Sequence, residues 1–257
     1  YDSVFGPFNG EVHLGGKTLH VNGRAIPMSQ TPDVSTLDLT GIDLVMECTG
    51  KADGRDVAGR PLKAGARRVL ISGPSAAADA TIVIGANGSD LADQQIISNA
   101  SCTTNALAPL VRLLDDTWGV RTGWMTTIHC YTGSQPTIDA PRGDMMRSRA
   151  AALSMVPTTT SAMRLLDHVL PDIAGRIEGA AVRVPVASVS AVDLTVTLQE
   201  DVSRDQVIEL LSKPTSIIGC TDKPLVSSDL RSRPESLIVS LPETRVTAQG
   251  LLRVFGW

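Results

Sequence analysis

The sequence predicts an α/β protein: a doubly wound sheet of parallel strands, followed by an α+β domain with an antiparallel sheet. Over residues 42–100, short apolar runs alternate with a helical stretch and with turn residues, which is the rhythm of a parallel α/β sheet. From about residue 102 on, the runs lengthen, and apolar and polar residues alternate along residues 192–198. A length of 257 residues is enough for two ordinary domains. We therefore predict domains at residues 1–101 and 102–257.

The first domain is expected to lack the opening unit of such a sheet. No Gly-x-Gly-x-x-Gly motif follows a strand near its start. The chain begins at Tyr1 in a turn-rich stretch and stops at Trp257, directly after an apolar run. We therefore expect an incomplete protein.

Composition narrows the class of protein. A hydrophobic content of 42% with 19% charged residues is typical of a soluble globular protein. The net charge of −4 argues against nucleic acid or an anionic membrane as a partner, and we expect no membrane span and no signal peptide. The 4 cysteines are widely spaced and form no Cys-x-x-Cys pair. This pattern favours free thiols in a reducing, cytoplasmic compartment over a disulfide framework or a metal site.

The elements of the first domain follow from its turn residues. Gly15-Gly16 and Asn22-Gly23 favour hairpin turns, so three short strands are predicted, at residues 11–14, 18–21 and 25–28. Buried strands are predicted at residues 42–48, 69–72, 81–86 and 95–100. Residues 55–63 predict a helix, which Gly59 and Pro61 weaken.

The second domain combines helices with long strands. Apolar residues with i, i+3, i+4, i+7 spacing predict a helix at residues 105–118, with Pro109 in its first turn. Further helices are predicted at residues 162–170 and 203–211, and Ser203 is a plausible N-cap of the last. Strands are predicted at residues 123–130, 179–199, 236–240 and 251–255, forming an antiparallel sheet with helices on one face. Residues 131–160 show no lasting periodicity, and a loop of that length is typically functional or disordered.

Cys102 stands at the predicted junction between a strand and the helix at residues 105–118. Free backbone N–H groups and the positive end of the helix dipole lower a thiol pKa and stabilise an oxyanion there. A cysteine nucleophile also needs a base or a cation, and His129, at the end of a strand, is the candidate. The alternatives are a small buried cysteine and a structural histidine. Arg183, inside an apolar run, is either an anion ligand or a member of a structural ion pair.

Residues 98–105 read Ser-Asn-Ala-Ser-Cys-Thr-Thr-Asn. This stretch resembles the active-site signature of phosphorylating glyceraldehyde-3-phosphate dehydrogenases and of the related erythrose-4-phosphate dehydrogenases. Residues 126–129 resemble the family's Thr-Thr-Val-His segment, and residues 183–185 its Arg-Val-Pro segment. The resemblance runs through almost the whole chain. It implies a remnant of a Rossmann-type dinucleotide-binding domain, followed by a catalytic domain.

The resemblance also implies the chemistry. Cys102 and His129 would form a thiolate–imidazolium pair. Cys102 would attack an aldehyde to give a thiohemiacetal, and hydride transfer to NAD would leave a thioester that inorganic phosphate displaces. The implied ligands of the phosphorylated aldehyde and of phosphate are Ser101, Thr103, Thr132, Thr160, Ser161 and Arg183.

For the cofactor, the resemblance points to Thr49, Gly50 and Ser72, which follow two predicted strands. The carboxyl ends of parallel strands are where such sheets bind dinucleotides. NAD rather than NADP is the family default. In the family the long loop lies against a neighbouring subunit, which implies a homotetramer.

Several positions depart from the family pattern. Ala106 stands where a second cysteine is common, and Ser161 replaces a glycine, which makes φ less free there. Ser134 and the segment at residues 142–149 also differ. These changes leave an erythrose-4-phosphate dehydrogenase as the alternative enzyme, favoured slightly by residues 147–151. Two hypotheses from other functional classes stay open. One is a non-catalytic fragment or binding scaffold, and the other is a Cys–His hydrolase.

Overall fold

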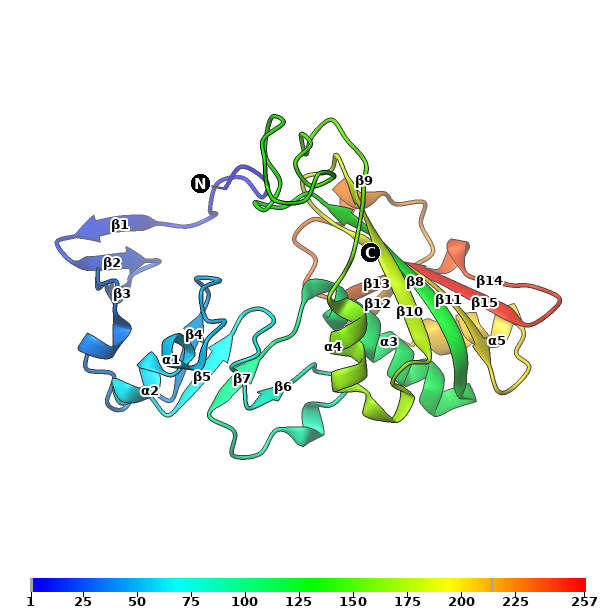
Figure 1. Cartoon of the computed structure of the whole chain (residues 1–257), viewed down its shortest axis with the longest axis horizontal. Coiled ribbons are helices and arrows are strands. Elements are labelled where there is room, and N and C mark those ends of the chain that lie inside the picture. Colours follow the sequence, from blue (N-terminus) through cyan, green and yellow to red (C-terminus); the bar gives the residue numbers. More distant parts are fainter. Residues whose placement is uncertain (1, 214) are drawn as a thin grey trace.

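The computed structural model describes residues 2–213 and 215–257, so Tyr1, the first residue of the predicted first domain, lies outside the described part. Its strands form three sheets, with the orders β1-β2-β3, β4-β5-β7-β6 and β12-β13-β15-β11-β8-β10-β9. Figure 1 shows the first two sheets at one side of the molecule and the large sheet at the other. The predicted α/β fold class is confirmed.

The first sheet is the antiparallel meander that its turns predict. It consists of β1 (Val12–Gly15), β2 (Thr18–Val21) and β3 (Arg24–Pro27). Gly16, Asn22 and Gly23 have positive φ values of 61°, 48° and 78°, as the tight hairpin turns require.

The second sheet is parallel, as predicted. It consists of β4 (Leu44–Glu47), β5 (Arg68–Ile71), β7 (Ile96–Ser98) and β6 (Ala80–Thr81). The strand predicted at residues 81–86 is wrong in extent, because the Asn87 side chain accepts from Val83 N at 2.8 Å and donates to Thr81 O at 3.0 Å. These bonds turn the chain out of the sheet. The predicted helix at residues 55–63 is split at Gly59 into α1 (Arg55–Ala58) and α2 (Arg60–Lys63).

The third sheet carries most of the core and is mixed. Its strands are β8 (Val120–Cys130), β9 (Val156–Thr158), β10 (Ile177–Val184), β11 (Ala191–Leu198), β12 (Ile218–Thr221), β13 (Leu237–Ser240), β14 (Arg245–Val246) and β15 (Leu251–Gly256). Most pairs are antiparallel, as expected, but β8 pairs with β10 and β12 with β13 in parallel. Between β8 and β10 the chain crosses back through α4 (Ala162–Val169), which is why those strands run the same way.

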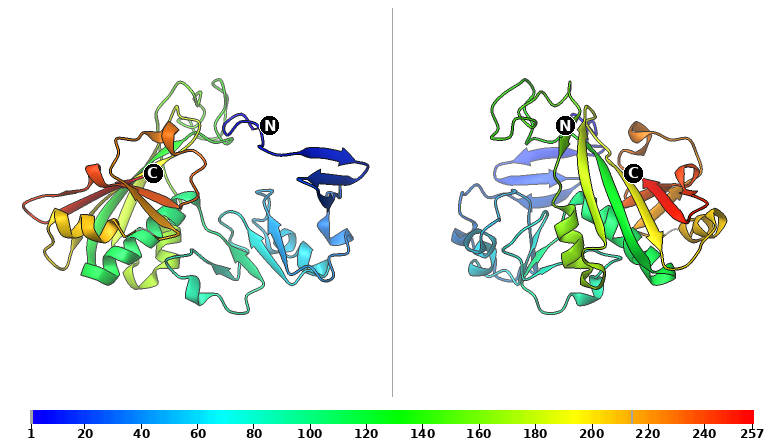
Figure 2. Two further views of the ribbon diagram at one scale, coloured as in Figure 1. Left: turned by 180° about the vertical axis from the view of Figure 1, so that it is seen from behind. Right: turned by 45° about the vertical axis from the view of Figure 1, so that its right-hand side comes forward.

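The longest helix, α3 (Cys102–Trp118), begins three residues earlier than predicted. Pro109 therefore lies in the helix interior, and its expected place in the first turn is wrong. The reason is that Ser101 caps the helix ahead of the apolar stripe. Buried side chains on α3 pack on the sheet: Leu107, Leu110, Leu114. Figures 1 and 2 show α3 and α4 beside the large sheet, and α5 (Arg204–Leu211), with the predicted Ser203 cap, joins the same core.

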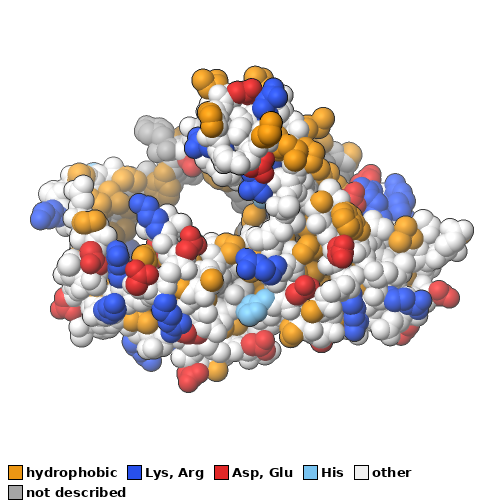
Figure 3. Space-filling view, viewed as in Figure 1, with side chains coloured by type: hydrophobic (Ala, Val, Ile, Leu, Met, Phe, Trp, Pro, Cys, Tyr) orange, Lys and Arg blue, Asp and Glu red, His pale blue; other side chains and the backbone are white. Residues whose placement is uncertain are grey.

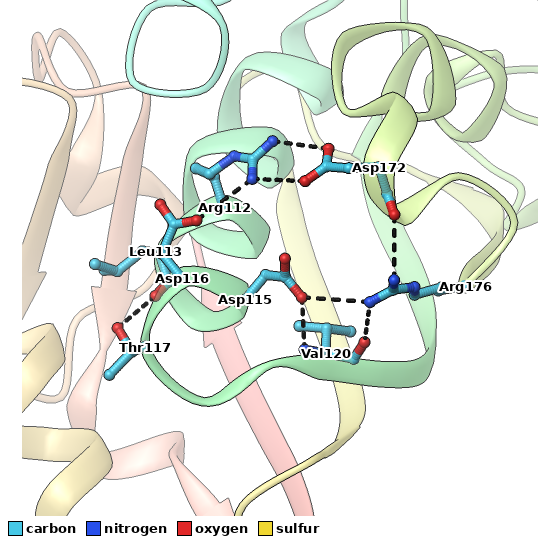
Figure 4. A network of polar contacts seen from close by, with 8 residues as sticks. All are labelled: Arg112, Leu113, Asp115, Asp116, Thr117, Val120, Asp172 and Arg176. Atoms are coloured by element: carbon cyan, nitrogen blue, oxygen red, sulfur yellow. Dashed lines mark hydrogen bonds and ion pairs between the residues drawn. The ribbon is translucent and has the colours of Figure 1, made fainter.

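A network of polar contacts fixes the far end of α3 (Figure 4). Arg112 donates to both carboxylate oxygens of Asp172 at 2.9 Å, and Arg176 donates to Val120 O at 2.9 Å. Asp115 accepts from Val120 N at 2.7 Å. The network therefore connects α3 to the first residues of β8 and to the segment before β10.

In the described part of the chain, no helix is both long enough and apolar enough to span a membrane.

Candidate active site

The turn between β7 and α3 is built by the small polar residues around Cys102. Ser98 Oγ donates to Gly73 O at 2.9 Å and accepts from Ala100 N at 3.1 Å, while Asn105 Nδ2 donates to Asn99 O at 2.7 Å. Ala100 has a φ of 55°, in the left-handed region that residues other than glycine seldom adopt. The signature is therefore also the set of side chains that holds this sharp turn.

Ser101 is the N-cap of α3. Its Oγ accepts from Thr104 N at 3.2 Å and lies 2.7 Å from Thr104 Oγ1. Cys102 is thus the first residue of the helix, and it is an exposed residue. The predicted helix-start setting of the cysteine is confirmed.

His129 lies beside the thiol. Its Nε2 is 3.4 Å from Cys102 Sγ, and its Nδ1 is 2.6 Å from Cys130 O. A carbonyl can only accept, so Nδ1 carries a proton and Nε2 faces the sulfur. The hydrogen bond to Cys102 raises the pKa of His129 to about 10, and the same bond lowers the pKa of the Cys102 thiol. Both shifts favour a thiolate beside an imidazolium.

Arg183 reaches the site because of strand register. In the parallel pair of β10 with β8, Arg183 stands opposite His129. Arg183 Nη1 donates to Thr132 Oγ1 at 2.8 Å and to Cys130 O at 3.4 Å. Among the described residues it forms no ion pair, so the structural ion pair considered from sequence is absent there. Burial and the neighbouring Arg147 lower the pKa of Arg183, which marks a place where an anion would be stabilised.

Arg147, in the long loop, is a candidate residue that the sequence did not single out. Its Nε donates to Thr158 Oγ1 at 2.7 Å, and its Nη2 donates to Thr159 Oγ1 at 3.3 Å. Its one acidic neighbour in the described part is Asp144, at 3.9 Å. In the sequence, Arg147 is recognisable only as an arginine upstream of three threonines. Because the loop has no periodicity, the sequence does not indicate where this side chain points.

Thr160 and Ser161 lead from β9 into α4. Thr160 Oγ1 accepts from Ala162 N at 3.1 Å, and Ser161 has φ −76°. This is an ordinary helical backbone, so the replacement of glycine by Ser161 imposes no strain. The restriction of φ that the sequence led us to expect at Ser161 therefore has no effect on the backbone.

A cavity of about 500 Å³ opens at the cysteine and histidine. It is lined on different sides by Cys102, Thr103, His129, Thr132, Ser190 and Trp257. The space is of the size that small-molecule sites have. Figure 3 shows the same molecule as a surface, hollowed between the long loop at the top and the parallel sheet below.

The three residues expected to bind the cofactor lie apart from this cavity, at the ends of two neighbouring strands. Thr49 and Gly50 follow β4, and Ser72 follows β5 and donates its N–H to Glu47 O at 3.0 Å. All three are exposed, and a side chain added at Gly50 would meet no atom within 4 Å. Hydroxyl and backbone groups beside open space at strand carboxyl ends fit the binding of a dinucleotide.

The site combines a thiol of lowered pKa with two arginines that have no carboxylate within hydrogen-bond distance among the residues that the structure describes. This combination is typical of an enzyme that forms a covalent bond to an anionic substrate. Comparison with known proteins identifies the enzyme family. The profile of "Glyceraldehyde 3-phosphate dehydrogenase, C-terminal domain" matches residues 101–257, and that of "Glyceraldehyde 3-phosphate dehydrogenase, NAD binding domain" matches residues 1–55. The chain belongs to the glyceraldehyde-3-phosphate dehydrogenase family.

Individual relatives agree. Glyceraldehyde-3-phosphate dehydrogenase of Xanthobacter flavus is 42% identical over 265 residues, which cover 100% of this chain and 79% of the relative. The enzyme of Pseudomonas aeruginosa is 43% identical over 263 residues, covering 100% and 78%. Glyceraldehyde-3-phosphate dehydrogenase 2 of Bacillus subtilis is 41% identical over 266 residues, covering 100% and 78%. The predicted family, enzyme class and NAD cofactor are thereby confirmed.

Proposed function

We propose that this enzyme catalyses the NAD-dependent oxidative phosphorylation of glyceraldehyde 3-phosphate to 1,3-bisphosphoglycerate, as a step of glycolysis or gluconeogenesis. The observation that carries the proposal is the 3.4 Å contact of Cys102 Sγ with His129 Nε2. A thiolate is the form of cysteine that attacks a carbonyl carbon, and a neighbouring imidazolium maintains it at neutral pH.

Cys102 and His129 carry the covalent steps. The thiolate adds to the aldehyde carbon, and the new alkoxide takes the proton of His129 to give a thiohemiacetal. His129 then removes that hydroxyl proton while the C–H bond breaks, and the carbon becomes a thioester of Cys102. Bound NAD supplies the hydride acceptor. Inorganic phosphate next attacks the thioester, and the thiolate of Cys102 leaves and is restored.

Two groups of donors are proposed for the two phosphates. One is Arg183 with Thr132, joined by a hydrogen bond of 2.8 Å. The other is Arg147 with the threonines before α4, including Thr160, and with the backbone of Ser161. A phosphate accepts hydrogen bonds from arginine and from hydroxyl groups, so each of these groups of donors is a suitable phosphate site. Ser101 and Thr103 flank the nucleophile. Ser101 Oγ accepts from Thr104 N as the cap of α3, and its O–H can still donate to a phosphate oxygen.

NAD is proposed to lie along the carboxyl ends of β4 and β5, held by Thr49, Gly50 and Ser72. The support is the open, hydroxyl-lined edge described above. We propose the same division as from the sequence, with a partial dinucleotide-binding domain at residues 1–101 and a catalytic domain at residues 102–257.

A homotetramer in the cytoplasm completes the proposal. The long loop between β8 and β9 exposes large apolar side chains: Ile138 76%, Met145 90%, Leu153 84%, Met155 74%. Such a patch is typical of a protein interface. All four cysteines are free, which suits a reducing compartment.

The test is steady-state reduction of NAD by the purified enzyme with glyceraldehyde 3-phosphate, with and without inorganic phosphate. We expect turnover that depends on phosphate and is lost in Cys102→Ser. Phosphate-independent release of the acid would favour a hydrolytic outcome and contradict the proposal. A higher kcat/KM for erythrose 4-phosphate would replace the substrate while leaving the thioester chemistry in place.

A further inference from the structure

Cys130, next to His129, is held by a residue that has no part in the chemistry above. Ser190 Oγ accepts from Cys130 N at 3.1 Å and donates to Cys130 Sγ at 3.4 Å. Ser190 is the residue before β11, which pairs with β8 beginning at Ala191 opposite Ile128. A single hydroxyl therefore fixes both the backbone and the side chain of Cys130.

The carbonyl of Cys130 is the group that orients the histidine ring. It lies 2.6 Å from His129 Nδ1. The same peptide unit is tied on its other side, because Tyr131 N donates to Val186 O at 3.2 Å. The segment from Val186 to Ser190 thus holds the carbonyl, and the carbonyl leaves Nε2 facing Cys102 Sγ.

The backbone of this segment is itself unusual. Val189 has a φ of 67°, in the left-handed region, where a β-branched residue is an outlier. Strained conformations persist only where the surroundings over-determine them, and they cluster at active sites. Here the strained residue directly precedes Ser190, whose hydroxyl contacts both the N–H and the sulfur of Cys130.

We propose that Ser190 is a positioning residue for the reaction: by holding Cys130 it fixes the carbonyl that selects the tautomer and the orientation of His129. The proposal rests on the function proposed above, because it assigns a role to a residue behind the Cys102–His129 pair. Ser190 also lines the cavity, but the role proposed here acts through Cys130 and needs no contact with the substrate.

Few other titratable or charged groups surround the Cys102–His129 pair in the described part of the chain. Cys130 comes from β8 and Arg183 from β10. Arg233 and Glu235, before β13, also line the cavity and are paired with each other at 2.5 Å. Ser190 does not titrate, but its hydrogen bond to Cys130 Sγ, after that of His129, lowers the pKa of the Cys130 thiol. A change at Ser190 therefore reaches the pH profile of Cys102 through the placement of His129 and through the Cys130 thiol.

The experiment is the rate of Cys102 alkylation by iodoacetamide from pH 5 to 10, mapped by mass spectrometry, in wild type, Ser190→Ala and Ser190→Thr. Loss of one positioning hydrogen bond should raise the apparent pKa of Cys102 by about one unit, an approximately tenfold loss of rate on the acid side. Ser190→Thr keeps the hydroxyl and should restore the wild-type profile. Thermal unfolding of each variant separates a shift in profile from a loss of fold.

Should Ser190→Ala fail to fold, Ser190→Val has the shape of the Ser190→Thr control without its hydroxyl and must shift the profile in the same direction. An unshifted profile in a folded variant overturns the inference and leaves the proposed function standing. A wild-type profile with the pKa of an ordinary thiol would contradict the Cys102–His129 pair itself, and with it the proposed function. Because alkylation needs neither NAD nor aldehyde, the two failures are distinguishable.

Discussion

At the scale of single residues, the chemistry depends on one proton shared by Cys102 and His129. The contact raises the pKa of His129 to about 10 and lowers that of Cys102, so the thiolate–imidazolium pair persists between these two values. It is lost on the alkaline side as the pH rises through about 10 and the imidazolium gives up its proton. It is lost on the acid side as the pH falls through the lowered pKa of the thiol.

His129→Asn should therefore return Cys102 toward the behaviour of an ordinary thiol. With a pKa near 8.5 only a few per cent is thiolate at pH 7, so alkylation at pH 7 should fall by about thirtyfold. Single-turnover acylation should fall further, by about 10²–10⁴, since a general base is also lost. His168→Asn, on the exposed side of α4, is the control and should change neither rate. Equal rates in His129→Asn and wild type would remove His129 from the mechanism.

The sequence predicted the residues whose positions follow from regular structure. Cys102 is fixed by a helix start, and His129 and Arg183 stand opposite each other in the β8–β10 pair. Arg147 and Ser190 could not be predicted in the same way. Arg147 lies in a loop without periodicity, and Ser190 lies at residues 185–190, where the structure interrupts the predicted strand region 179–199 between β10 and β11. In both segments only tertiary contacts decide which way the side chain points.

At the scale of elements, the start of α3 serves both stability and reactivity. Ser101→Ala removes an N-cap and should cost about 1 kcal/mol of unfolding free energy. Ser203→Ala, at the capped start of α5, should cost a similar amount. Only Ser101→Ala should also slow the alkylation of Cys102, because only that helix start adjoins a thiol. An equal effect of both variants on alkylation would separate the cap from the reactivity.

The contact of Arg112 with Asp172 stabilises the far end of α3. Arg112→Ala should lower the unfolding free energy at pH 7 by about 1 kcal/mol, the upper range for a partly exposed pair. Arg112 lowers the pKa of Asp172, so this stabilisation is present above the ordinary carboxyl pKa of about 3.9 and is lost as the pH falls through the lowered value. The difference between wild type and variant in chemical denaturation should accordingly shrink as the pH falls below the ordinary carboxyl range and through that lowered pKa.

Arg67→Ala is the matched control for that pair. Arg67 and Asp43 also meet at 2.9 Å, but their side chains are 78% and 80% exposed. The substitution should change the unfolding free energy by less than about 0.5 kcal/mol. A cost equal to that of Arg112→Ala would mean that the bidentate geometry of the Asp172 contact adds nothing.

The type of most elements was predictable, whereas strand direction and exact limits were not. Periodicity identifies β8 as a strand, but it does not say that β10 will lie parallel to it, since that follows from the crossover through α4. Pro109 was misplaced because the apolar stripe begins after the cap, and only the Ser101 hydrogen bond reveals where α3 starts.

At the scale of the whole molecule, the exposed apolar loop should determine assembly. Leu153→Lys and Met145→Lys place charges on the most exposed apolar side chains of that loop, and burial of an unpaired charge is costly. We expect sedimentation equilibrium to show a smaller species in the double variant than in wild type. Unchanged mass, with wild type already a tetramer, would place the subunit interface elsewhere; Met46→Lys, on β4, is the control for an exposed apolar side chain outside the loop.

The distances along the chain between the active-site residues also determine when the site forms during folding. Along the chain, 27 residues separate Cys102 from His129, and 53 separate Cys130 from Arg183. Contacts this distant form late, and a strand slipped by one residue would turn Arg183 to the opposite face. During synthesis, Cys102 leaves the ribosome before the partners that activate it. In a newly made chain, Cys102 is therefore an ordinary thiol that reacts slowly. Cys102 becomes sensitive to oxidants only when folding is complete.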